Sequence, residues 1–93
     1  MKAGLAGYRV VTTAGAFECT GKFERIAETY VLRLFVITAE ARLIEADIRK
    51  ERSVEVVAIA GGEPIMAARI RQVKARGSGA FLEVACLLWG PEQ

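Results

Sequence analysis

Turn-forming residues divide this chain into short apolar runs, and that spacing constrains the fold more than any other feature. β-branched and aromatic residues fill the runs, and Gly, Pro or a polar cluster follows each one. The predicted strands are Tyr8–Thr13, Ala16–Phe23, Thr29–Thr38, Val54–Ala60, Ile65–Ala75 and Ala80–Trp89. The predicted turns are Ala14-Gly15, Glu24–Glu28, Gly61–Pro64 and Gly77–Gly79. The pattern predicts a mainly β fold, a small antiparallel barrel or curled sheet of about six or seven strands.

The stretch from residue 39 to residue 52, AEARLIEADIRKER, fits two structures. As a helix it places Ala41, Ile44 and Ile48 on one face. As a strand it alternates Arg42, Ile44, Ala46 and Ile48 with their neighbours, and the polar residues that follow form a turn. The alternative to an all-strand fold is therefore an α+β fold, with one helix at about 39–52 packed on an antiparallel sheet.

The hydrophobic content is high for so short a chain. Hydrophobic residues make up 53% of its 93 residues before glycine is counted, and typical soluble domains reach roughly 45–50% with glycine included. We expect one compact domain, 1–93, that buries only about 60–65% of its unfolded surface. The apolar surface left over predicts a homo-oligomer or a protein partner.

The C-terminal hairpin allows the most detailed prediction. If Gly77-Ser78-Gly79 is a three-residue loop, Arg76 lies opposite Ala80. One face of the hairpin is then apolar and belongs to the core: Met66, Ala68, Ile70, Leu82, Val84, Cys86 and Leu88. The other face carries Arg69, Arg71, Val73, Phe81, Glu83, Ala85, Leu87 and Trp89.

This second face is the candidate interaction surface. Its chemistry-bearing residues are Arg69, Arg71, Phe81, Glu83, Leu87 and Trp89, and Arg and Trp are enriched at the anchor points of protein interfaces. Two interpretations stay open. The face binds protein or another copy of the chain, or a helix at 39–52 covers it and makes the aromatic residues a second core layer.

Basic residues suggest a nucleic-acid surface as an alternative. Arg49, Lys50 and Arg52 form one short cluster, and Lys74 and Arg76 extend the run that begins at Arg69. With nearby aromatic residues such a surface suits nucleic acid. The net charge is only +2, and nearby glutamates can balance the run, so the pattern favours protein over nucleic acid. Arg33, inside an apolar strand, needs a carboxylate partner or an exit to solvent, and we expect a paired structural arginine rather than a catalytic one.

Catalysis is not expected. The chain has no histidine and one aspartate, Asp47, which excludes histidine-based triads and histidine metal sites. Cys19 and Cys86 form no motif and are expected to be unpaired core residues. We expect no enzyme, no cofactor and no metal site.

Two partial resemblances each cover about half of the chain. Glu45-Ala46-Asp47-Ile48, followed by the strands ending in Ala67–Val73 and Phe81–Val84, resembles the second half of a PilZ-type barrel. That resemblance implies cyclic-dinucleotide binding through a DxSxxG turn, but Asp47–Arg52 here lacks the Ser and Gly. Gly15–Gly21 with Tyr30–Leu34 is similar to an Sm-like strand pair, which implies RNA binding, without the Asp and Asn of that family.

These observations lead to one expectation and two alternatives. The expectation is a non-enzymatic structural or adaptor module that acts through self-assembly or protein binding. The alternatives are a nucleic-acid-binding barrel of Sm-like type and a degenerate PilZ-type regulatory domain. No membrane span or signal peptide is visible, which predicts a cytoplasmic protein. The scarcity of Asn, Gln and Met is typical of thermophile chains, and a GC-rich genome gives a similar bias.

Overall fold

Six strands and one helix make up the fold. The computed structural model describes residues 5–60, 68–77 and 79–89. The elements in chain order are β1 (Leu5–Thr12), β2 (Gly15–Ile26), β3 (Thr29–Ile37), α1 (Thr38–Arg49), β4 (Glu55–Ala60), β5 (Ala68–Arg76) and β6 (Phe81–Leu88). The mainly β prediction is confirmed.

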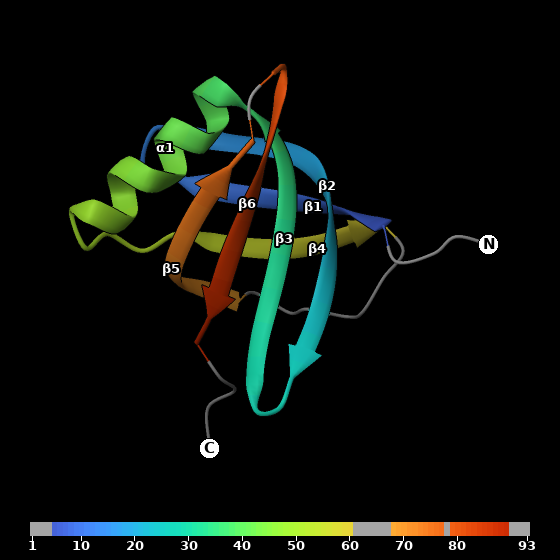
Figure 1. Cartoon of the computed structure of the whole chain (residues 1–93). Helices are drawn as coiled ribbons and strands as arrows, with labels where there is room; N and C mark the ends of the chain where they lie inside the picture. The colour runs from blue at the N-terminus through green and yellow to red at the C-terminus, as the bar shows by residue number, and fades with distance from the viewer. Residues whose placement is uncertain (1–4, 61–67, 78, 90–93) are drawn as a thin grey trace.

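The strands close into an antiparallel barrel in the order β1-β2-β3-β6-β5-β4. Figure 1 shows α1 lying beside β5 at one end of the barrel, between the end of β3 and the start of β4. Closure removes the unpaired sheet edges that would otherwise template aggregation. The predicted small barrel is therefore confirmed.

Alternation along the strands builds the core. In β3, Leu32, Leu34 and Val36 point inward and are fully buried, while Arg33 between them points outward. The buried core residues are Ala6, Tyr8, Val10, Leu32, Leu34, Val36, Ala41, Ile44, Val54, Val56, Ile70, Leu82, Val84, Cys86 and Leu88. Each large apolar side chain buried this way contributes roughly 1.5–3 kcal/mol to folding.

Residues 38–49 form a helix, so the strand interpretation of 39–52 is wrong. Ala41 and Ile44 are fully buried in the barrel core, and the Glu40 carboxylate accepts a hydrogen bond from the Ile37 backbone at the helix start. A strand would have sent Ile44 and Ile48 to the same face as Arg42. The helical period instead buries the apolar residues and exposes Arg42.

The helix ends in a Schellman motif. The backbone N–H of Glu51 donates to the Ile48 carbonyl at 3.0 Å, and that of Arg52 donates to the Asp47 carbonyl at 2.8 Å. Glu51 occupies the left-handed position of this motif with φ 61°. Glycine usually stands there, because a Cβ makes left-handed backbone unfavourable.

One predicted turn is corrected by the structure, and another lies outside the described residues. Strand β2 continues through the predicted Glu24–Glu28 turn, and only Ala27 and Glu28 connect it to β3, with Ile26 opposite Thr29. The predicted turn at Gly61–Pro64 lies outside the described residues, as does Met66.

The register of the C-terminal hairpin differs from the prediction. Arg76 lies opposite Glu83, not Ala80, because the connection after Gly77 is longer than a three-residue loop. The register also shifts between Ile70 and Gln72, so Arg71 is an extra residue in a β-bulge. The inward face of β6 is as predicted.

The bulge reverses the two faces of β5. Before it, Ala68 and Ile70 face the core; after it, Val73 and Ala75 do. The prediction that Val73 lies on the outer face is therefore wrong. Lys74 and Arg76 are exposed instead, since one extra residue inverts the alternation.

Gly21 occupies a place in β2 that no larger residue fits. A Cβ built there would lie 2.7 Å from the Arg33 carbonyl oxygen and 2.9 Å from a methyl carbon of Leu34. Backbone on the adjacent strand cannot move aside as a flexible side chain can.

We predict that Gly21→Ala destabilises the barrel by about 1–3 kcal/mol, because β2 and β3 must separate to admit the methyl group. Thermal unfolding followed by circular dichroism measures the change. Thr20→Ala, at the neighbouring exposed position, is the control and should stay within about 0.5 kcal/mol of the wild type. Equal stability of the two variants would contradict the close approach.

We also predict that Glu51→Gly stabilises the protein by about 1 kcal/mol, because glycine adopts the left-handed conformation without strain. The melting temperature should rise by roughly 4–8 °C. Glu51→Ala removes the same charge but keeps the Cβ, so it should not give this rise. A similar gain from both variants would assign the effect to the charge instead.

Candidate functional site

The structure separates the six predicted surface residues into distinct places. Arg69, Arg71 and Trp89 gather at one groove. Glu83 is bound to Arg33 in the middle of the outer face, with 3.0 Å between the Glu83 Oε2 and an Arg33 nitrogen. Phe81 lies at the end of β6 that is far from Trp89. The half-buried Leu87 lies two residues before Trp89, near the other end of the strand.

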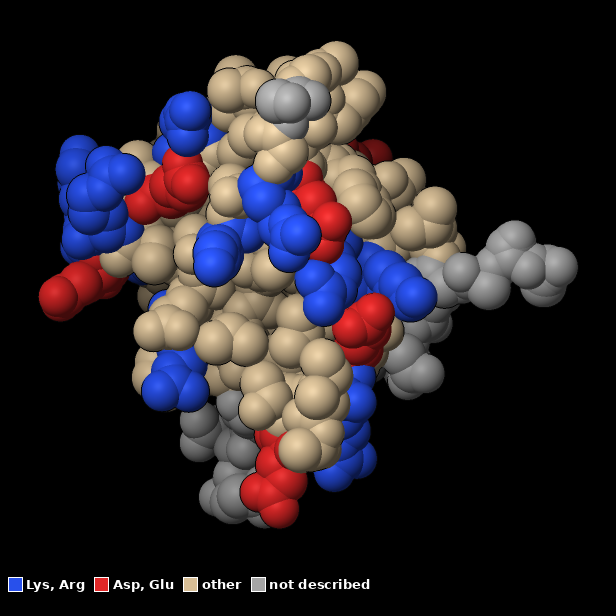
Figure 2. Space-filling model, viewed as in Figure 1, with Lys and Arg blue, Asp and Glu red and all other residues tan. Residues whose placement is uncertain are grey.

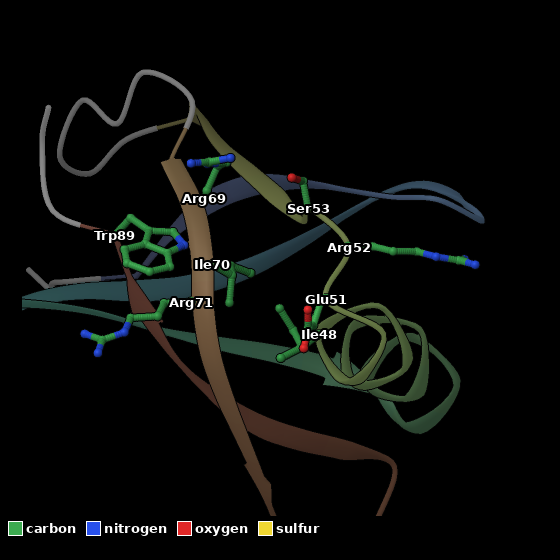
Figure 3. A pocket seen from close by; sticks show the side chains of 8 residues that line it. All are labelled: Ile48, Glu51, Arg52, Ser53, Arg69, Ile70, Arg71 and Trp89. Carbon is green, nitrogen blue, oxygen red and sulfur yellow. The ribbon is translucent and has the colours of Figure 1, made fainter.

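The groove lies where the end of α1 meets β5 and the residue after β6. It encloses about 280 Å³ and is lined by Ile48, Glu51, Arg52, Ser53, Arg69, Ile70, Arg71 and Trp89. Figure 3 shows Trp89 and Arg71 on one side of β5, with Ile70 and the end of α1 on the other. The lining therefore combines an aromatic ring, aliphatic side chains and guanidinium groups.

Trp89 is held at this groove by two contacts. Its backbone N–H donates to the Arg69 carbonyl at 3.0 Å, and the Arg71 guanidinium lies over its ring at 5.2 Å from the centroid. An exposed cation–π pair of this kind contributes about 0.5–1 kcal/mol. The ring is thus pre-positioned although 53% of the residue remains exposed.

The outer face of the hairpin is not a second core layer. Phe81 is 64% exposed and Trp89 53% exposed, so the interpretation in which the helix covers them is wrong. The reason is that α1 turns its apolar residues Ala41 and Ile44 into the barrel core.

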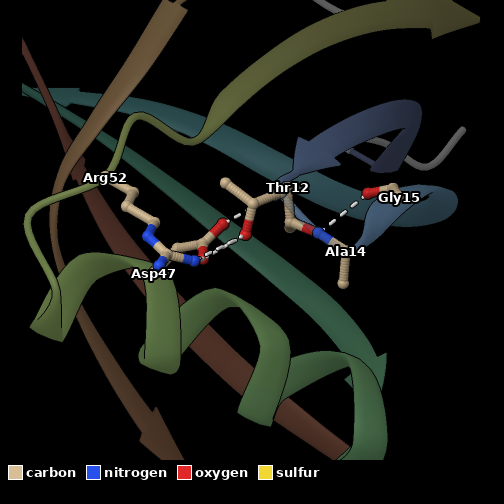
Figure 4. A network of polar contacts seen from close by, with 6 residues as sticks. Thr12, Ala14, Gly15, Asp47 and Arg52 are labelled. Carbon is tan, nitrogen blue, oxygen red and sulfur yellow. Dashed lines mark hydrogen bonds and ion pairs between the residues drawn. The ribbon is translucent and has the colours of Figure 1, made fainter.

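A buried carboxylate holds the helix side of the groove in place. Asp47 is only 4% exposed and accepts hydrogen bonds from the Thr13 backbone N–H at 2.8 Å and from the Thr13 hydroxyl at 2.7 Å. Arg52 adds a longer contact, 3.9 Å to Asp47 Oδ1. Figure 4 shows this cluster tying α1 to the turn between β1 and β2.

The turn itself is arranged to meet Asp47. The Thr12 hydroxyl donates to the Gly15 carbonyl at 2.8 Å and accepts from the Ala14 N–H at 3.2 Å. These bonds present the Thr13 donors to the helix. Sequence reasoning missed the role of Asp47, although its spacing from Ala41 and Ile44 places it on the buried face.

The Thr13 hydrogen bonds hold the pKa of Asp47 below its ordinary value. The positive charges of Arg52 and Lys50 also lower this pKa, and burial opposes them by raising it. The backbone N–H of Thr13 has the largest effect. Asp47 is therefore a charged structural residue. The segment that the PilZ resemblance aligns with a turn, Asp47–Arg52, begins in the last residues of α1 and continues in the turn after it.

The predicted nucleic-acid contacts fall into two groups. Arg49 and Lys50 are exposed at the end of α1, next to Arg52, whose Nη1 donates to the Thr13 hydroxyl at 3.3 Å. Lys74 and Arg76 are exposed on the later half of β5. The structure does not bring the two groups together into one cluster.

Arg33 has carboxylate partners, as expected for an arginine inside an apolar strand. It lies 3.0 Å from Glu83 and 3.5 Å from Glu24, which joins β3 to β6 and β2. Figure 2 shows blue and red side chains alternating in a band across the middle of this face. The predicted paired, structural arginine is confirmed.

Carboxylates and thiols are the side chains of this chain that can ligate a metal ion. Across residues 5–60, 68–77 and 79–89 there is no group of three metal-ligating side chains. Both cysteines are free, and burial raises the pKa of each thiol to about 12. A thiol with such a pKa is protonated at neutral pH and is a poor nucleophile.

Comparison of the chain with protein-family models, with curated proteins and with solved structures gave no match. Among the described residues, no helix has the length and apolar character needed to cross a membrane.

We predict that Asp47→Asn lowers the melting temperature near neutral pH, because the amide replaces one acceptor of the Thr13 hydrogen bonds with a donor. A carboxyl pKa that is lower in the folded state than the unfolded value of about 3.9 stabilises the fold above that pH. This contribution is lost as the pH falls through the folded-state pKa.

The difference in melting temperature between the wild type and Asp47→Asn should therefore shrink toward zero below about pH 4. Differential scanning calorimetry from about pH 7 to about pH 3 measures it. A difference that stays constant over this range would contradict the charged state assigned to Asp47.

Proposed function

We propose that this protein is a non-enzymatic structural or adaptor module that binds protein, either a different chain or another copy of itself. The observation that carries the proposal is Trp89, half-exposed at the groove with Arg71 stacked on its ring. Trp and Arg are the residues most enriched at interface positions that dominate binding energy.

The character of the groove supports binding rather than chemistry. Its aliphatic floor and aromatic wall suit an apolar side chain, and its arginines suit a partner with carboxylates. Among the described residues that line it, Glu51 is the one carboxylate. A rigid, partly apolar recess is the usual place for a partner's anchor residue.

Uncovered apolar side chains support self-association as one form of this binding. The exposed large hydrophobic residues are Leu5, Val11, Ile26, Ile37, Leu43, Ile59, Phe81 and Trp89. Ile37 and Phe81 are direct neighbours across β3 and β6. The proposal includes the cytoplasmic setting and the homo-oligomer that the sequence predicts.

We predict that the wild type exceeds its monomer mass of 10.1 kDa at micromolar concentration and that Trp89→Ala shifts it toward that mass. Removal of an interface anchor typically costs about 2–4 kcal/mol of binding, or a change in affinity of roughly 30- to 1,000-fold. Light scattering coupled to size-exclusion chromatography measures the mass.

The melting temperature of the Trp89→Ala monomer should stay close to that of the wild-type monomer, because an exposed side chain contributes little to the core. Phe81→Ala is the matched control, since it removes an exposed aromatic ring at the other end of β6. If Trp89→Ala retains the wild-type mass, or if both proteins are monomeric up to high concentration, the groove is not a self-association surface.

A further inference from the structure

The bulge at Arg71 gives β5 a row of basic residues on its outer face. Arg69 and Arg71 precede or occupy the bulge, Lys74 and Arg76 follow it, and all four are exposed. With regular alternation Lys74 and Arg76 would lie on the opposite face from Arg69 and Arg71. The row begins at the groove and continues toward the far end of the strand.

No carboxylate neutralises this row within the part of the chain that the structure describes. Glu83 lies opposite Arg76, but its carboxylate binds Arg33 at 3.0 Å. Glu55 lies opposite Arg69 and forms no ion pair with it among the described residues. The row therefore keeps its positive charge, although the chain as a whole carries only +2.

We infer that the partner contributes an extended acidic segment that lies along β5, with an apolar residue in the groove beside Trp89 and carboxylates on the basic row. The inference rests on the proposed function and names the chemistry of the partner. Strand residues two apart are separated by about 6.7 Å. An extended segment repeats at the same interval, so carboxylates at every second position match Arg69 with Arg71 and Lys74 with Arg76. The bulge at Arg71 shortens the three-residue step between the two pairs.

Protein fits this surface better than nucleic acid. The groove floor is aliphatic, with Ile48 and Ile70, and one side of the Trp89 ring is in contact with Arg71. Glu83 on β6 lies opposite Arg76 and places a carboxylate beside the row, where it would repel a continuous chain of phosphates. A segment with a few placed carboxylates avoids that repulsion.

The segment belongs to a different protein, which would compete with a second copy of this chain for the groove. In the whole sequence the only two carboxylate residues spaced by two are Glu45 and Asp47. Both lie in α1, and Asp47 is buried against Thr13. This chain therefore has no acidic segment of the required spacing to offer a second copy.

The test uses a synthetic peptide with one leucine followed by four aspartates that alternate with threonines. Trp89 is the only tryptophan of the chain, so its fluorescence reports occupation of the groove directly. The control peptide has the same composition with its aspartates contiguous. A thymidine decanucleotide is the nucleic-acid probe, and each titration is repeated at low and high sodium chloride concentration.

We expect the alternating peptide to bind more tightly than the contiguous one and to weaken as the salt concentration rises. Lys74→Glu/Arg76→Glu should weaken it by roughly tenfold, since two favourable ion pairs become repulsive. Arg9→Glu/Lys22→Glu changes the net charge equally on β1 and β2 and should have less than a twofold effect. Melting curves establish whether each variant is folded. For a variant that does not fold, the same residues are changed to glutamine instead of glutamate.

The inference is overturned if the wild type does not bind the peptide, or if Lys74→Glu/Arg76→Glu binds the peptide as tightly as the wild type does. It is also overturned if the wild type binds the oligonucleotide more tightly than the peptide and this variant weakens the oligonucleotide binding. The proposed function is tested separately. If Trp89→Ala weakens peptide binding and Lys74→Glu/Arg76→Glu does not, the inference of an acidic segment is wrong but the proposed function stands. If Trp89→Ala binds the peptide as the wild type does and keeps the oligomeric mass, the groove itself is wrong.

Discussion

The contact between Asp47 and Thr13 is the interaction on which the candidate site depends. A barrel end covered by a helix needs something to set the helix position, because apolar packing alone is not directional. Two short hydrogen bonds from Thr13 to the buried carboxylate supply that direction. They also place the last turn of α1, so Ile48 and Arg52 reach the groove opposite Trp89.

The β-bulge at Arg71 serves the core and the surface at once. It returns Val73 and Ala75 to the barrel interior and leaves Lys74 and Arg76 in solvent. The bulged residue itself reaches over Trp89. One inserted residue therefore places Arg71 over Trp89 at the end of the groove. It also places the basic residues of the later half of β5 on the outer face.

The charges of the outer face are divided between structure and binding. Arg33 uses the carboxylates of Glu24 and Glu83 to connect β2, β3 and β6. Glu83 lies opposite Arg76 of β5, but its carboxylate binds Arg33 instead. Among the described residues Arg76 therefore has no ion pair, and the basic row supports the proposal of a partner with carboxylates.

The sequence by itself determined the mainly antiparallel β fold and the inward face of β6, because alternation and turn residues are local signals that burial reinforces. It left open whether the sheet closes into a barrel and whether Arg33 meets a carboxylate or solvent. It left residues 39–52 undecided, since a helix and a strand both gave an apolar face. Only the tertiary structure decided that α1 covers the barrel end, that Asp47 meets Thr13, and that Lys74 shares a face with Arg71. Local spacing places Asp47 on the buried face of the helix, but it does not identify a partner 34 residues away, and the extra residue in the β5 ladder leaves no local signal.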